Sequence, residues 1–113
     1  MKSLIVLWAL AVSTADAADT QNGEAVYQAN CMACHGAAAD GKGPAAAALN
    51  PPPTNFTDPA YWAGKTDEQV KQAIKVGKPG TSMIGFSRIS DEDLADLVAF
   101  MRTKVAEPEP SPE

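Results

Sequence analysis

Apolar residues recur at helical spacing in three stretches of the chain, and no stretch alternates apolar and polar residues as a strand would. The clearest stretch runs from Ser90 to Arg102, and its apolar positions i, i+3, i+4 and i+7 are Leu94, Leu97, Val98 and Met101. Ser90 is a favourable N-cap, and the three acidic residues after it suit the positive end of a helix dipole. The pattern therefore predicts a C-terminal helix whose Met101 packs in the core.

Two earlier stretches also predict helices. The first extends from about Thr20 to Asn30, with Thr20 as its candidate N-cap. The second extends from about Asp67 to Val76, and Thr66 and Gln69 form the T-x-x-Q pattern of a capping box at its start. Its apolar stripe is Val70, Ala73 and Ile74, and Gly77 ends it.

The segment 36–66 is rich in glycine and proline and predicts no long regular element. Asp58-Pro59 favours the start of a short helical turn that carries Tyr61 and Trp62. A loop of this length is uncommon in a small domain unless it wraps around something. Together these patterns predict an all-α fold with three main helices and short turns around a bound group.

Both ends of the chain differ from the part between them. Residues 1–17 have the order of a secretory signal peptide: Lys2, nine apolar residues from Leu4 to Val12, and Ala15-Asp16-Ala17 as a cleavage signal. Nine apolar residues are too few for a membrane span, which needs about 20. Residues 106–113 are acidic and proline-rich and predict a disordered tail. We therefore expect one domain over residues 18–105, export to the periplasm, and no integral membrane span.

The net charge is −5, from 9 basic and 14 acidic side chains. No run of basic residues interrupts this acidic composition, which gives no support to nucleic-acid binding. A group of four lysines, Lys65, Lys71, Lys75 and Lys78, is the local exception. They are consistent with a positive docking face, although such lysines are more often ordinary solvated surface.

Cys31-Met32-Ala33-Cys34-His35 carries the strongest chemical signal in the chain. A C-x-x-C-H run is the attachment sequence of a c-type haem, in which two thiols form thioethers with one porphyrin and the histidine binds the iron. Three alternatives are weaker. A structural zinc site needs four ligands, whereas the chain has two cysteines and one histidine. A thioredoxin-like dithiol needs a βαβ setting, and a disulfide across two residues closes too small a loop to stabilise much.

The motif thus predicts one covalently attached haem c, held by Cys31, Cys34 and His35. We expect a methionine at the second axial position of the iron, because a thioether is commonly the ligand opposite histidine. Met1 belongs to the signal peptide, Met32 lies between the two cysteines, and Met101 continues an apolar helix face. Met83 remains, in an aperiodic loop far enough along the chain to pass round the porphyrin. The alternatives are that Met83 packs in the core, or that the iron is left open or is bound by a lysine.

With these residues in place, the chain resembles the class I c-type cytochromes, and in detail the haem domains of cytochrome c subunits of cbb-type terminal oxidases and their small soluble relatives. The matching segments follow the family's order over residues 19–104. They are Gly23 to Tyr27, Cys31 to Gly36, Asp40 to Pro44, Asn50 to Pro53, Phe56 to Pro59, Gly77 to Met83 and Leu94 to Arg102. Ile84 is a departure, since a proline usually follows the ligand methionine in the family.

The resemblance implies a small all-α cytochrome c fold wrapped around one covalently bound haem. It also implies that the first and last helices cross, with Gly23 and Tyr27 meeting the last helix near Leu97 and Phe100.

The same resemblance implies a role for a backbone group. The carbonyl of Pro44 would accept the N–H of the haem-binding imidazole and so fix the orientation of the ring. Tyr61 and Trp62 fall where family members place groups near a haem propionate, and plain core packing explains the two residues equally well.

These inferences lead to a soluble single-haem electron carrier, not an enzyme, whose iron is bound by His35 and Met83 and is closed to substrates. Its partners would be redox proteins, a donor and an acceptor that the sequence does not name, and we expect a monomer. Two alternatives stay open. One is a haem-carrying subunit of a larger dehydrogenase or oxidase, and the other is a ligand-binding or peroxidatic haem protein in which Met83 is displaced.

Overall fold

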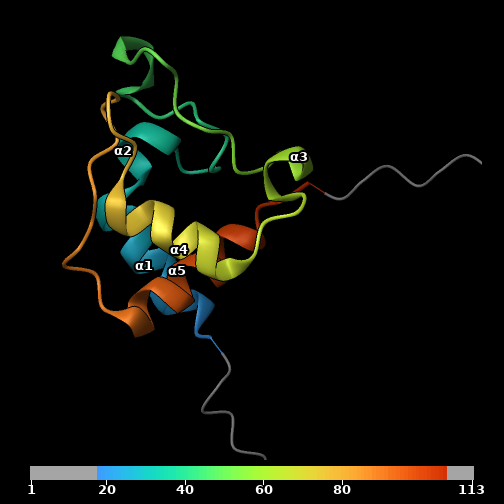
Figure 1. Ribbon diagram of the computed structural model, residues 1–113. Coiled ribbons are helices and arrows are strands. Elements are labelled where there is room, and N and C mark those ends of the chain that lie inside the picture. Colours follow the sequence, from blue (N-terminus) through green and yellow to red (C-terminus); the bar gives the residue numbers. More distant parts are fainter. Residues whose placement is uncertain (1–17, 107–113) are drawn as a thin grey trace, which may run out of the picture.

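Helices form all the regular structure in residues 18–106, which are the residues that the computed structural model describes. In chain order they are α1 (Thr20–Asn30), α2 (Met32–His35), the 3-10 helix η1 (Ala46–Ala48), α3 (Pro59–Trp62), α4 (Asp67–Val76) and α5 (Asp91–Arg102). The all-α prediction is confirmed, and the three long helices have the predicted bounds (Figure 1). None of these helices has the length and apolar character needed to cross a membrane. The predicted signal peptide and residues 107–113 of the predicted tail lie outside the described residues.

Side-chain caps fix where α4 and α5 begin. The capping box predicted for α4 is present: the hydroxyl of Thr66 accepts the N–H of Gln69 at 3.2 Å, and the side chain of Gln69 accepts the N–H of Thr66 at 2.9 Å. Ser90 caps α5 as predicted, by accepting the N–H of Asp93 at 3.1 Å. Each cap gives a hydrogen-bond partner to amides that the helix itself leaves unpaired.

The cap of α1 differs from the prediction. The N-cap is Asp19 and not Thr20, because the carboxylate of Asp19 accepts the N–H groups of both Gln21 and Asn22, at 3.0 and 3.2 Å. A charged oxygen also interacts more favourably than a hydroxyl with the positive end of the helix dipole.

α1 and α5 cross and form the main helix contact of the fold (Figure 1). Gly23 is buried at the crossing, where a Cβ would lie 2.0 Å from the carbonyl oxygen of Asp96. One turn further along α1, the rings of Tyr27 and Phe100 pack with their centroids 5.4 Å apart. The predicted crossing of the first and last helices, with Gly23 and Tyr27 against α5 near Phe100, is confirmed.

The core continues from this crossing to α4, which also packs on α5. Its largest fully buried side chains are Tyr27, Leu94, Leu97, Met101, Val70 and Val98. Met101 is buried as predicted. The stripe predicted for α4 is buried at Val70 and Ile74, and Ala73, on the same face, lines a cavity described below.

The segment between α2 and α4 is held to the helices by aromatic residues. Trp62, at the end of α3, is buried and donates its indole N–H to the carbonyl of Phe56 at 2.9 Å. The guanidinium of Arg102 lies 4.5 Å from the centre of the Trp62 ring. Ala106 then donates its N–H to the carbonyl of Thr57 at 2.8 Å, so Ala106 belongs to the fold and not to the predicted tail.

Candidate functional site

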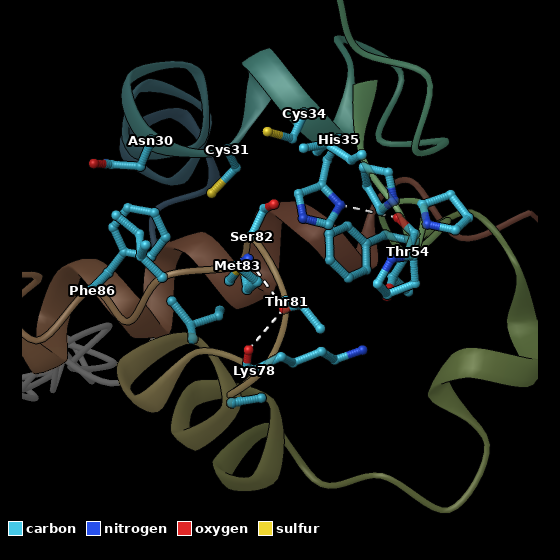
Figure 2. Close-up of a pocket in the computed structure, with 18 of the residues that line it drawn as sticks. Asn30, Cys31, Cys34, His35, Thr54, Lys78, Thr81, Ser82, Met83 and Phe86 are labelled. Carbon is cyan, nitrogen blue, oxygen red and sulfur yellow. Dashed lines mark hydrogen bonds between the residues drawn. The ribbon is translucent and has the colours of Figure 1, made fainter. Parts of the chain in front are cut away.

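A cavity of about 430 Å³ opens between α2, the segment 49–56, α4 and the loop 78–86 (Figure 2). Its walls are mainly apolar and include Leu49, Pro51, Pro52, Pro53, Phe56, Ile74, Ile84, Phe86 and Met101. The groups in it that can carry chemistry are Cys31, Cys34, His35, Tyr61, Lys78 and Met83. The volume falls within the range of about 300–1,000 Å³ that is usual for small-molecule and cofactor sites.

One helical turn places the two cysteines and the histidine in this cavity. Cys31 ends α1 and begins α2, and its carbonyl accepts the N–H of His35 at 2.9 Å. Residues i, i+3 and i+4 of a helix share one face, so Cys31, Cys34 and His35 project to the same side. The two cysteines do not form a disulfide with each other. Burial, and then the neighbouring Cys34, raise the pKa of the Cys31 thiol to about 11, so this thiol is neutral at pH 7 in the chain without haem.

The imidazole of His35 is held in a fixed orientation. Its Nδ1 lies 3.0 Å from the carbonyl oxygen of Thr54, and its ring stacks on Phe56 with centroids 4.4 Å apart. Because a carbonyl only accepts hydrogen bonds, Nδ1 carries the proton and Nε2 is left to bind a metal. Burial lowers the pKa of His35, the positive charge of Lys78 lowers it further, and the bond to Thr54 opposes both effects. His35 is thus prepared as a neutral ligand.

The prediction that Pro44 supplies this carbonyl is wrong in the structure. The backbone on both sides of Pro44 is bonded to α2 itself: Gly43 donates its N–H to the carbonyl of Cys34 at 3.0 Å, and Ala45 donates to that of Ala33 at 2.9 Å. Pro44 is exposed and does not line the cavity. The imidazole instead meets the later segment at Thr54.

Met83 reaches the cavity from the loop that follows α4. Figure 2 shows it approaching from this loop, whereas Cys31, Cys34 and His35 come from the α1–α2 side. Three hydrogen bonds shape the loop: Lys78 N–H to the carbonyl of Met83 at 3.1 Å, Met83 N–H to the Thr81 hydroxyl at 3.1 Å, and that hydroxyl to the carbonyl of Lys78 at 2.8 Å. The loop therefore presents Met83 in a defined position.

Gly77 allows this loop to lie against α4. It has φ +77°, and a Cβ there would lie 2.7 Å from the carbonyl oxygen of Met83. Phe86 then donates its N–H to the carbonyl of Ile74 at 3.0 Å, which fastens the far end of the loop to the same helix. The backbone of the Met83 loop is thus clamped at both ends.

The other methionines of the described residues are placed differently. Met101 lines the cavity but is 2% exposed and belongs to the core face of α5. Met32 is partly buried, packs against the core and does not line the cavity.

Tyr61 and Trp62, for which the sequence left a propionate contact and core packing equally open, have different surroundings. Trp62 is in the core and does not line the cavity. Tyr61 does line the cavity, and burial raises the pKa of its phenol. Core packing therefore accounts for Trp62, whereas Tyr61 faces the cavity with its ring edge-on to Phe56, at a centroid distance of 5.2 Å.

Three of the four lysines considered as a docking face are held by other groups. Lys71 lies 3.0 Å from Glu68, and Lys75 lies 2.6 Å from Asp91, whose pKa it lowers. Lys65 donates to the carbonyl of Tyr61 and lies over its ring. Lys78 lines the cavity, a position that the sequence did not predict.

The donors in the cavity fit one haem c. Two thiols, an imidazole nitrogen and a thioether line a single space with apolar walls, which suits the apolar faces of a porphyrin. Within residues 18–106, no group of three or more His, Cys, Asp or Glu side chains is arranged to hold a bare metal ion. The chemistry of this donor set therefore favours haem over a metal ion alone.

Comparisons with known proteins point the same way. Residues 20–104 match the sequence model of the cytochrome c family. The chain is also similar to the dihydro-heme d1 dehydrogenase of Pseudomonas aeruginosa, with 38% identity over 81 residues that make up 70% of this chain and 14% of that protein. This relative is thus several times longer than the part that the chain matches.

Two solved structures share the fold. One is a chain of the reducing HAO-like protein complex of Kuenenia stuttgartiensis, with a TM-score of 0.68 and 28% identity over 84% of this chain and 49% of that chain. The other is the c-type cytochrome KustC0563, with a TM-score of 0.60 and 25% identity over 74% of this chain and 96% of that chain. The chain therefore belongs to the cytochrome c family: it is a class I c-type cytochrome, an electron-carrying domain that binds haem c covalently.

Proposed function

We propose that the protein is a soluble single-haem carrier that passes one electron at a time between redox proteins, with His35 and Met83 as the two axial ligands. The observation that carries this proposal is that His35 and Met83 reach one cavity from two different segments. When bound, haem supplies one-electron oxidation and reduction at its iron. The chain supplies the tethers, the ligands and an apolar surrounding.

Two side-chain ligands would leave no coordination position for a substrate. The clamped loop of Met83 supports this, because its hydrogen bonds and its attachment to α4 resist displacement of the thioether. Carbon monoxide tests the point on the purified haem protein. We expect the reduced protein at pH 7 to keep its spectrum under carbon monoxide. A shifted spectrum at this pH would instead identify the ligand-binding alternative, with Met83 displaced.

An apolar rim beside the cavity supports docking to another redox protein. Val76 and Ile84 are the large hydrophobic residues most exposed among residues 18–106, at 57% and 67%. Ile84 lines the cavity, and Val76 ends α4 beside the same loop. We infer that electrons pass at this rim. We propose a monomer that meets its donor and acceptor in turn.

Export to the periplasm is part of the same proposal. It is supported by the signal-peptide pattern of residues 1–17. It is also supported by the two cysteines, because export to an oxidising compartment suits thiols that are captured by a porphyrin and not left free. Fractionation of the cells that make the protein, with mass spectrometry of its N-terminus, tests this. We expect a periplasmic protein that begins at Ala18; an uncleaved N-terminus in the cytoplasmic fraction would contradict the proposal.

A haem-carrying subunit of a larger assembly is the second candidate. It is favoured by the two relatives of which the chain covers 14% and 49%, one described as a dehydrogenase and one as a complex. The free carrier is favoured by the c-type cytochrome of which the chain covers 96%. The native mass of the haem protein in a fresh extract distinguishes them: a free carrier elutes at the mass of one chain, and a subunit elutes with partners.

A further inference from the structure

The cavity contains a single lysine and no acidic residue. Among the described residues that line it, Lys78 is the only lysine or arginine, and aspartate and glutamate are absent. Cys31, Cys34 and His35 are used in holding the haem, so Lys78 and Tyr61 are the titratable groups left at its wall. The cavity therefore offers one cationic side chain, that of Lys78, to an anionic group of a bound ligand.

The backbone of Lys78 is fixed while its side chain is free to pair. The N–H of Lys78 donates to Met83 at 3.1 Å, and its carbonyl accepts the Thr81 hydroxyl at 2.8 Å. No ion pair of Lys78 occurs within residues 18–106, in contrast to Lys71 and Lys75 on the neighbouring helix. A fixed backbone with an unpaired ammonium group is suited to receive an anionic ligand.

The Lys78 side chain lies along the wall of the cavity. Figure 2 shows the Lys78 side chain running along the cavity toward the side that carries Thr54 and His35.

We propose that Lys78 is the counter-ion for a carboxylate of the bound haem, and that its charge raises the reduction potential of the protein. Haem carries two propionate carboxylates, and a carboxylate beside apolar walls is costly unless a cation pairs with it. A positive charge near the site also favours the reduced state, which carries one positive charge fewer than the oxidised state. The proposal rests on haem lying in this cavity and does not depend on Met83 being a ligand.

Potentiometric titration of three variants of the haem protein tests this role. Lys78→Gln removes the charge, Lys78→Arg keeps it, and Lys71→Gln is the control, since it changes the net charge equally but lies outside the cavity. At a fixed solution potential, we expect Lys78→Gln to lower the ratio of reduced to oxidised protein about three- to tenfold, where tenfold corresponds to about 59 mV for one electron. Lys78→Arg should stay close to the wild type, and Lys71→Gln within about twofold of it.

The dependence on pH separates a counter-ion from a merely structural lysine. With its partner removed, the carboxylate has a higher pKa, so the potential of Lys78→Gln should vary more with pH between about 5 and 7 than that of the wild type. Tyr61 does not titrate in this window, since its pKa is raised. Equal potentials and equal pH profiles for Lys78→Gln and the wild type would overturn the proposal, and so would an Arg variant that behaves like the Gln variant.

The same samples separate this proposal from that of the axial ligand. A wild-type ferric protein without a sulfur-to-iron absorption band would contradict ligation by Met83 and leave the test of Lys78 intact. An unchanged potential with an unchanged pH profile in Lys78→Gln would contradict the role of Lys78 and leave ligation by Met83 intact.

Discussion

Gly23→Ala should destabilise the protein even though alanine is the better helix former. In α1, alanine in place of glycine is worth about 0.5–1 kcal/mol of helix stability. The new Cβ, however, would lie 2.0 Å from the carbonyl oxygen of Asp96 and 2.9 Å from the Cβ of Phe100. A close carbon–oxygen contact is about 3.3 Å, so α1 and α5 would have to separate by on the order of 1 Å.

The cost of this separation exceeds the gain in helix propensity. The overlap is with backbone, which cannot rotate away as a side chain can, so the upper part of the range of about 1–3 kcal/mol for overpacking applies. The net loss should be about 2 kcal/mol in the free energy of unfolding, measured by guanidinium titration of the haem protein. Gln28→Ala, at an exposed site of the same helix, is the control and should change stability by less than about 0.5 kcal/mol. A Gly23→Ala protein as stable as the wild type would refute the close approach of α1 and α5.

Two further predictions concern the phenol at this crossing and the apolar rim. Tyr27 donates its hydroxyl to the carbonyl of Gly36, and burial raises its pKa well above 10. Its contribution to stability is therefore full below pH 10, where the unfolded chain also keeps the proton, and is lost as pH rises above 10. Tyr27→Phe should cost about 1 kcal/mol at pH 7 but lose less stability than the wild type above pH 10, and equal losses would contradict the raised pKa. Ile84→Asp should slow electron self-exchange, measured by NMR line broadening, about tenfold, because like charges would face each other across the contact. Gln21→Asp is the control, because Gln21 lies in the first turn of α1 and does not line the cavity. This variant should leave the exchange rate close to that of the wild type.

The elements that sequence predicted well are those governed by local rules. α4 and α5 begin at the expected capping residues, and all three long helices have the expected bounds, because caps and apolar periodicity act within a few residues. The crossing of α1 and α5 was reached in a different way, through the resemblance to a family. No local pattern in residues 20–30 states which distant helix Gly23 must meet.

The features that sequence missed depend on contacts between distant backbone segments. The partner of His35 is a carbonyl, which every residue possesses, so no side-chain pattern distinguishes Thr54 from Pro44. Ala73 fits the apolar stripe of α4, but no local pattern shows that it lines a cavity and not the helix core. In the sequence Lys78 cannot be distinguished from an ordinary surface lysine, and only the fold of the Met83 loop brings it to the cavity wall.

The optical spectrum of the ferric protein tests the central claim, ligation by Met83, most directly. Met83→Leu and Met101→Leu are a matched pair, because both residues line the cavity and leucine keeps nearly the same volume. We predict that Met83→Leu loses the sulfur-to-iron charge-transfer band and has a lower reduction potential, since a thioether opposite histidine favours the reduced state. Met101→Leu should keep the band. A Met83→Leu protein that retains the band, or a Met101→Leu protein that loses it, would contradict the account.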